Sequence, residues 1–213
     1  MKAPLPPQPR PLPDLRELDV IVIGGSAGSF QVLTQLMPSL PTAVPVVVVV
    51  HLPADRDTPL AEVLGESTGR PTLEAMDKAP LTPGVIHFAP PGYHLLLESE
   101  KTFALSVDPP VHFSRPSIDV LFESAAEAFG ERVLGVVLTG ANEDGAQGLR
   151  AIRGAGGFCI VQRPDTAEAP FMPKAAIQAA TPDRILSIGE MEAFFQQLAA
   201  DPAQGTGAGG THA

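Results

Sequence analysis

The stretch from Asp19 to Ser29 constrains the fold of this chain more than any other. Four consecutive β-branched apolar residues, Val20 to Ile23, run directly into a cluster of glycines and serines. A short apolar run bounded by turn residues predicts a strand that is buried on both faces of a parallel sheet. Apolar residues then recur at helical spacing from Phe30 to Met37. The turn between them is therefore expected to join a strand to a helix.

This turn has the spacing Gly24-x-Ser26-x-Gly28 of a nucleophile elbow, in which a serine sits on a sharp strand-to-helix turn. Its hydroxyl would project near the first free N–H groups of the helix, which can stabilise an oxyanion. Two other readings stay open, a phosphate or dinucleotide cradle and a plain tight turn. The dinucleotide pattern G-x-G-x-x-G is absent, because Ser26 and Ser29 stand where two of its glycines would be, and no Walker A lysine follows.

Length and composition limit the class of protein. The 213 residues, 44% of them hydrophobic, suit one α/β domain with an added hairpin. A net charge of −10 argues against nucleic acid or an anionic membrane surface as the main partner. The only cysteine, Cys159, excludes a disulfide framework and a cysteine-based zinc site, and a cytoplasmic location is expected. Neither a signal region nor an apolar run long enough to span a membrane is present in the sequence.

The chain divides into three parts. Residues 1–18 begin with six closely spaced prolines and are predicted to form an extended tail. Residues 19–199 should form the domain, and residues 200–213, rich in glycine and alanine, a disordered tail.

Alternating strand and helix patterns within the domain predict an α/β fold with a doubly wound, mostly parallel, Rossmann-like sheet. After the first unit, strands are expected at residues 46–50, 133–138, 156–162 and 184–187, and helices at residues 59–68, 117–129, 145–153, 174–180 and 190–199. Between residues 71 and 106 the pattern changes to four short strands, at residues 72–75, 84–88, 93–98 and 102–107. This region is expected to be an antiparallel hairpin edge or insertion.

Two further polar residues follow strands of this sheet. His51 comes directly after the strand at 46–50, and Asp144 lies in a glycine-flanked loop after the strand at 133–138. Alone, His51 would be a structural or solvated residue and Asp144 a helix cap. With Ser26, however, they form a hydrolase constellation at the carboxyl edge of one sheet. The chain order Ser, His, Asp differs from that of the α/β-hydrolases, so a separate fold is expected.

Other polar residues carry less information. Arg115 precedes the predicted helix N-cap Ser117 and suits an acidic group, although a surface arginine is an equally good interpretation. His87, Tyr93 and His94 match no metal-ligand spacing and are expected to pack or to face solvent.

Several separated motifs together identify a family. They are Gly24-Gly25-Ser26-Ala27-Gly28, Val50-His51-Leu52-Pro53, the run from Arg115 to Phe122, Leu138-Thr139-Gly140 with Asp144-Gly145-Ala146, and the run from Met172 to Ile177. In this order they resemble the catalytic domain of the CheB protein-glutamate methylesterases, over residues 19 to 199.

The resemblance implies hydrolysis of glutamate γ-methyl esters on chemoreceptors, and in some members deamidation of glutamine. Ser26 would be the nucleophile, His51 the base and Asp144 the residue that orients the base. No metal and no cofactor is implied. The partner would be a methyl-accepting chemotaxis receptor or another methylated protein, with neither nucleic acid binding nor direct membrane insertion.

This sequence departs from the family pattern near the predicted site. Ala27 and Ser29 replace the usual threonine and glycine, and Gly140-Ala141-Asn142 replaces Gly-Met-Gly. The methionine N–H is implicated in the family's oxyanion hole, and Ala141 could keep that donor. With Ala27 and Arg115, it is a predicted oxyanion or substrate residue.

The family's usual phosphoacceptor receiver domain has no counterpart in this sequence. We therefore expect constitutive activity or a regulator acting in trans. A non-catalytic binding module that retains the fold is the alternative function.

Overall fold

The structure is a computed structural model that describes residues 10–51 and 60–200. At its centre lies a sheet of seven strands in the order β3-β4-β2-β1-β7-β8-β9. All neighbouring strands of this sheet are parallel, where the sequence predicts a mostly parallel sheet. The strands are β1 (Val20–Gly25), β2 (Val46–Val50), β3 (Thr72–Glu74), β4 (Ile86–Phe88), β7 (Val133–Val137), β8 (Phe158–Gln162) and β9 (Arg184–Leu186).

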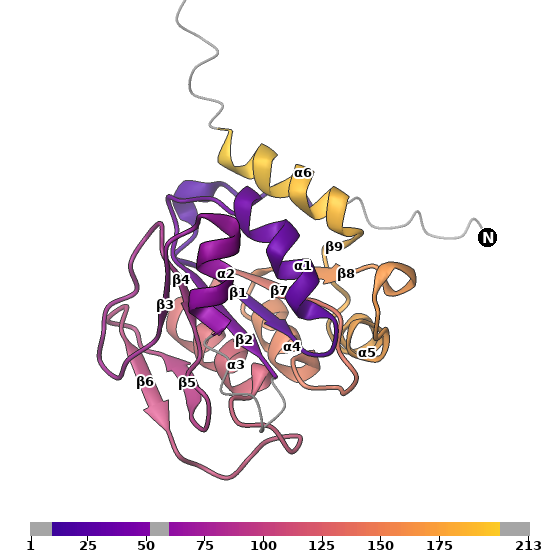
Figure 1. Cartoon of the computed structure of the whole chain (residues 1–213). Coiled ribbons are helices and arrows are strands. Elements are labelled where there is room, and N and C mark those ends of the chain that lie inside the picture. Colours follow the sequence, from indigo (N-terminus) through magenta and orange to yellow (C-terminus); the bar gives the residue numbers. More distant parts are fainter. Residues whose placement is uncertain (1–9, 52–59, 201–213) are drawn as a thin grey trace, which may run out of the picture.

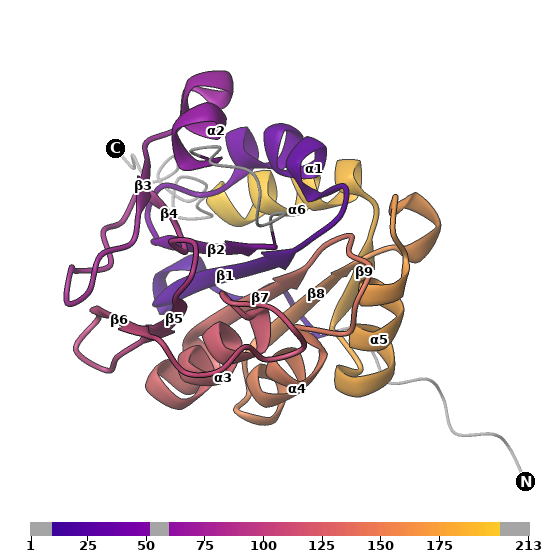
Figure 2. The ribbon, with the colours of Figure 1, turned by 60° about the horizontal axis from the view of Figure 1, so that its bottom comes forward.

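Helices cover both faces of the sheet, as Figures 1 and 2 show. One face carries α1 (Ser29–Leu36), α2 (Leu60–Thr68) and α6 (Ile188–Ala199), and the other α3 (Ile118–Phe129), α4 (Ala146–Gly154) and α5 (Phe171–Ala180). Because side chains of a strand alternate between faces, β1 supplies both layers of the core. Ile21 and Ile23 pack toward α1 and α6, and Val20 and Val22 toward α3. This burial on both faces explains the continuous apolar run.

The order of the strands determines where a site can form. β1 is followed in the chain by β2 on one side of it, and β7 later joins β1 on the other side. The winding direction therefore changes at β1. In open α/β sheets, ligands bind outside the carboxyl ends of the strands at such a switch point. Ser26, His51 and Asp144 follow β1, β2 and β7, which are three adjacent strands.

The region between residues 71 and 106 is only partly antiparallel. β5 (His94–Leu97) and β6 (Phe103–Ser106) form the expected antiparallel hairpin, which packs against α3. β3 and β4 instead join the main sheet as parallel strands, so their assignment to an antiparallel insertion was wrong. Such short runs reveal that a strand exists but carry no signal for its direction. His87 and His94 are buried within this region and Tyr93 is exposed, as expected for packing and surface residues.

Residues 10–18, which the sequence assigns to an extended tail, contact the domain. Leu15–Glu17 form one turn of 3-10 helix, Leu12 and Leu15 pack against the core, and Leu18 belongs to it. The Arg10 guanidinium also donates hydrogen bonds to the carbonyls of Gly156 and Gly157. The predictions for residues 1–9 and 201–213, and for the Leu52-Pro53 end of the histidine motif, lie outside the described residues.

The last two helices begin earlier than predicted. α5 begins at Phe171 rather than at Lys174, and Pro173 is accommodated in its first turn, where no N–H is needed. α6 begins at Ile188 because Ser187 and Glu190 form a reciprocal capping box. The early start of α5 brings Phe171 to the same edge of the sheet as Ser26.

Candidate active site

Glycines make the turn after β1 sharp enough to place Ser26 at the edge of the sheet. A Cβ on Gly24 would lie 2.2 Å from Ile118 Cγ2, so only glycine lets β1 and α3 approach this closely. Gly28 has φ 80°, a left-handed conformation that glycine adopts at low cost, and it caps α1. Ser29 is buried, and its hydroxyl donates to the Ser26 carbonyl at 2.6 Å. The backbone of the elbow is thus fixed by close packing against α3 at Gly24 and by the Ser29 hydroxyl at the Ser26 carbonyl.

Ser26 and His51 lie directly after the ends of two neighbouring strands. Gly25 and Val50 are partners in the parallel register of β1 and β2, and the residues that follow these two strands are Ser26 and His51. The His51 N–H donates to the Gly25 carbonyl at 3.1 Å. Both residues therefore follow the carboxyl ends of parallel strands, as the sequence predicts.

His51 and Asp144 are in direct contact. His51 Nε2 lies 2.8 Å from Asp144 Oδ2, and the Asp144 side chain is fully buried. The same carboxylate accepts three more hydrogen bonds, from the Ser117 hydroxyl and from the N–H groups of Ile118 and Asp119. Asp144 therefore caps α3, whereas the sequence suggested a cap of its own helix, α4.

This network keeps Asp144 ionised. Burial alone would raise the pKa of the carboxyl, but the hydrogen bonds from His51, Asp119 and Ile118 outweigh it and hold the pKa of Asp144 below its usual value. A carboxylate accepts hydrogen bonds only, so His51 Nε2 is the donor in this pair. The imidazole is consequently fixed with Nδ1 as its unprotonated nitrogen, which can accept a proton.

Two side chains that are not among the predicted site residues lie at this second nitrogen. Ser114 Oγ and Asn142 Nδ2 are each 3.5 Å from His51 Nδ1. The only sequence signals for these two residues were the family departure at Asn142 and the position of Ser114 shortly before α3.

Ser26 Oγ makes no hydrogen bond with any residue of the described ranges 10–51 and 60–200.

The predicted oxyanion donors have unused N–H groups. Ala27 and Ala141 are exposed, and their backbone N–H groups donate to none of the residues that the structure describes. Thr139 ties the two loops together, because its hydroxyl donates to the Ala27 carbonyl at 2.9 Å and accepts from the Ala169 N–H at 2.9 Å. Two N–H groups on loops joined in this way suit a developing oxyanion.

Arg115 is engaged elsewhere. Its Nη1 donates to the backbone carbonyls of Val107 at 2.8 Å and Asp108 at 3.0 Å. The guanidinium thus fastens the start of the 107–116 loop, and no acidic partner for it occurs among the described residues. Its role toward a substrate stays a prediction.

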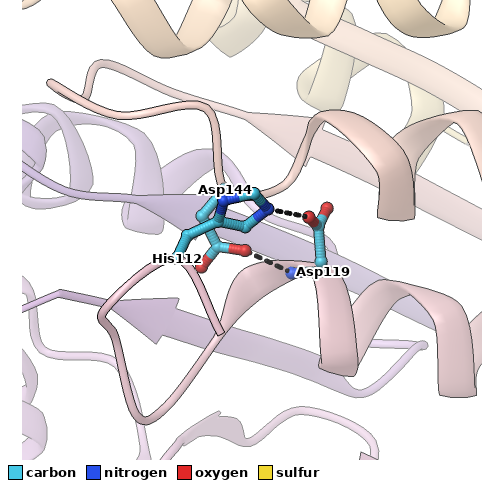
Figure 3. Close-up of side chains that lie close together, drawn as sticks. All are labelled: His112, Asp119 and Asp144. Atoms are coloured by element: carbon cyan, nitrogen blue, oxygen red, sulfur yellow. Dashed lines mark hydrogen bonds and ion pairs between the residues drawn. The ribbon is translucent and has the colours of Figure 1, made fainter. Parts of the chain in front are cut away.

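A second carboxylate lies beside the first (Figure 3). His112 Nε2 is 3.3 Å from Asp119 Oδ2, and ligand atoms of His112, Asp119 and Asp144 lie within 4.8 Å of one another. This is the donor set of a metal site, but the Asp144 oxygens already accept four hydrogen bonds and Asp119 Oδ1 accepts one from the Gly148 N–H. A cation would have to displace these donors, so the cluster is better described as a hydrogen-bonded support for Asp144.

The pKa of Asp119 provides a test of this arrangement. Burial and the nearby Asp144 charge raise the pKa of Asp119 to about 6, against the lowering effect of the Gly148 N–H and His112. A carboxyl whose pKa is raised on folding binds protons more tightly when folded, so it costs stability as pH rises from its unfolded value, about 4, to about 6. Asp119→Asn keeps an acceptor for Gly148 and cannot ionise.

We therefore expect Asp119→Asn to gain stability relative to the parent as pH rises over this window, by about 1–3 kcal/mol in all. Urea unfolding across the window measures it. Equal pH dependence of the two proteins would contradict the assignment.

The chain's only thiol takes no part in the site. Burial raises the pKa of Cys159 to about 12, so the thiolate needed for nucleophilic attack is not formed near neutral pH.

No helix of the described residues is long and apolar enough to cross a membrane.

A doubly wound parallel sheet with serine, histidine and buried aspartate at the carboxyl ends of three adjacent strands defines a class of α/β protein suited to hydrolytic chemistry. Comparison with known proteins agrees. The family model described as CheB methylesterase matches residues 21–195. The chain belongs to this CheB methylesterase family.

Individual relatives extend the comparison. A putative protein-glutamate methylesterase/protein-glutamine glutaminase of Leptospira interrogans is 44% identical over 84% of this chain and 94% of the relative. A protein-glutamate methylesterase/protein-glutamine glutaminase of Symbiobacterium thermophilum is 37% identical over 79% of this chain and 47% of the relative. The crystal structure of the Thermotoga maritima CheB methylesterase catalytic domain matches with a TM-score of 0.79 at 29% identity, covering 85% of this chain and 98% of that one.

Proposed function

We propose that this protein hydrolyses glutamate γ-methyl esters on a methylated chemoreceptor protein, and deamidates glutamine at such positions, with Ser26, His51 and Asp144 as its catalytic residues. The observation that carries the proposal is the 2.8 Å contact between His51 Nε2 and the buried Asp144 carboxylate, at the strand end that lies opposite Ser26. The names of the relatives support the type of reaction and of substrate.

The arrangement assigns a task to each residue. Asp144 holds Nε2 protonated, so Nδ1 is the base that takes the Ser26 proton as Oγ attacks the ester carbonyl. The C–O bond to the methoxy group then breaks, the imidazolium returns the proton, and methanol leaves. Water attacks the acyl-enzyme in the same way and releases the glutamate side chain and the free Ser26 hydroxyl.

Electrostatics favour this sequence of steps. The imidazolium formed in each step lies against the ionised Asp144, which stabilises it without taking its proton. The N–H groups of Ala27 and Ala141 would donate to the tetrahedral oxyanion, the first of them coming from the residue after the nucleophile, as in other elbows. No step requires a metal ion or a cofactor.

A covalent probe and product detection test the proposal together. A fluorophosphonate should label the intact protein once, and peptide mass spectrometry should place the adduct on Ser26. The same preparation should release methanol from a chemoreceptor fragment methylated by its methyltransferase. If neither the adduct nor methanol forms, while the fragment still binds, the protein is a binding module that has kept the fold.

A further inference from the structure

The exposed phenylalanines of this protein have an unusual distribution. Of ten phenylalanines, seven are buried, and three are exposed: Phe30, Phe113 and Phe171, at 39%, 104% and 57%. Each of the three belongs to a segment at the carboxyl edge of the sheet, where Ser26 and His51 lie. Phe30 is in the first turn of α1, Phe171 opens α5, and Phe113 lies in the loop before α3.

Direct contacts tie these segments to the proposed catalytic residues. Ser114, the neighbour of Phe113, has its hydroxyl 3.5 Å from His51 Nδ1. The loop before Phe171 is bonded to the end of β7, since the Ala169 carbonyl accepts from the Gly140 N–H and the Met172 N–H donates to the Gly140 carbonyl. This loop also touches the elbow, because a Cβ on Gly28 would lie 2.7 Å from Glu168 Cβ.

The backbone around Phe113 has an unfavourable conformation. His112 and Phe113 form the centre of a turn closed by two hydrogen bonds between Val111 and Ser114, and both have positive φ, 48° and 62°. Histidine is among the residues that tolerate this conformation, but a bulky phenylalanine rarely adopts it. The His112 ring lies close to two carboxylates, with Nε2 3.3 Å from Asp119 Oδ2 and Nδ1 3.6 Å from Glu143 Oε1, and these contacts hold the turn in place. A strained turn that presents a fully exposed phenylalanine beside the site is expected where a partner binds.

We propose that Phe30, Phe113 and Phe171 form a docking rim for the protein segment that carries the ester, a segment whose residues flanking the modified glutamate are apolar or small and uncharged. This inference rests on the proposed function, because a side chain that reaches Ser26 must bring its own polypeptide over these loops. Two exposed carboxylates lie beside these segments, that of Glu143 next to His112 and that of Glu168 in the loop before Phe171, and they disfavour acidic flanks.

Binding and catalysis are measured separately on the full chain. A short fluorescein-labelled peptide with a central glutamine between alanine and leucine residues is the binding probe, and a second peptide has glutamate flanks. The first peptide, with glutamate γ-methyl ester in place of glutamine, and 4-nitrophenyl acetate are the substrates. The variants are Phe30→Ala, Phe113→Ala and Phe171→Ala, alone and combined. Leu73→Ala, at 57% exposure on the outermost strand β3, is the matched control.

Aromatic side chains at the centre of an interface are the residues whose loss most weakens binding. Phe113→Ala should weaken binding of the apolar peptide about tenfold, and the triple variant more. KM for the peptide ester should rise by the same factor, whereas these variants should turn over 4-nitrophenyl acetate, which is too small to need the docking rim, at the parental rate. The Leu73→Ala control should match the parent in peptide binding and in turnover of both substrates. The glutamate-flanked peptide should bind more weakly than the apolar one.

Two results would overturn the docking rim: equal binding of the apolar peptide by the parent and the triple variant, or no binding by the parent. Binding that depends on the phenylalanines without methanol release would instead keep the rim and reject the proposed esterase function.

Discussion

Replacing Ser26 by alanine is expected to lower methanol release from a methylated receptor fragment by at least about a thousandfold. The change removes one oxygen from the edge of the sheet, where Ser26 Oγ has no hydrogen-bond partner among the described residues, so the fold should be retained. Without that oxygen no acyl-enzyme forms, and only binding and the oxyanion donors remain. Single-turnover methanol assays on the parent and the variant measure the loss.

Ser114→Ala is the matched control for this variant. The Ser114 hydroxyl lies 3.5 Å from His51 Nδ1, the nitrogen proposed to take the Ser26 proton, but on a loop rather than at the elbow. Methanol release by this variant should therefore fall by less than about tenfold. Reversal of the two effects would identify Ser114 as the nucleophile. His51→Ala should cost about as much as Ser26→Ala, and the double variant little more, because residues that act as a unit are not additive.

The sequence predicts those parts of the site whose positions depend on where the strands end. Buried strands were recognisable from their apolar runs, and residues directly after neighbouring parallel strands must meet at one edge. That Ser26, His51 and Asp144 share this edge follows from the rule, whereas the direct contact of His51 with Asp144 does not, because β1 lies between their strands β2 and β7. The ring nitrogen involved, and the capping of α3 by Asp144, depend instead on how the 107–116 loop and α3 pack.

Other features required the tertiary structure. His112 and Asp119 are seven positions apart with a turn between them, and nothing in that spacing indicates their 3.3 Å contact. Likewise β3 and β4 could be recognised as strands, yet their parallel direction depends on the connection through residues 75–85 and on pairing with β2. Local sequence patterns thus predicted the helices and strands, whereas the contacts of loop residues and the direction of the short strands depend on tertiary packing.

Asp144→Asn should affect both catalysis and stability, because the two carboxylate oxygens each accept two hydrogen bonds. The amide has a single acceptor oxygen. In either orientation its NH₂ group faces a buried backbone N–H at the start of α3, that of Ile118 or that of Asp119. Leaving such a donor unsatisfied costs about 1–3 kcal/mol, which urea unfolding near neutral pH would detect.

The catalytic loss in Asp144→Asn has a separate cause. An amide NH₂ directed at His51 Nε2 stabilises the tautomer protonated at Nδ1, which cannot take the Ser26 proton, so turnover should fall by about a thousandfold or more. Asp108→Asn, which removes an exposed carboxylate, should change neither property. Parental activity in Asp144→Asn would contradict the role of Asp144 in orienting the base.

The stability effect of Asp144→Asn should depend on pH. The folded-state pKa of Asp144 is lowered, so the stability that its ionised form contributes is complete above the unfolded value, about 4, and is lost as pH falls through the folded pKa. The gap in unfolding free energy between parent and variant should therefore be constant near neutral pH and shrink below about pH 4. A gap that stays constant throughout acidic conditions would mean that Asp144 is not stabilised as a carboxylate in the folded protein.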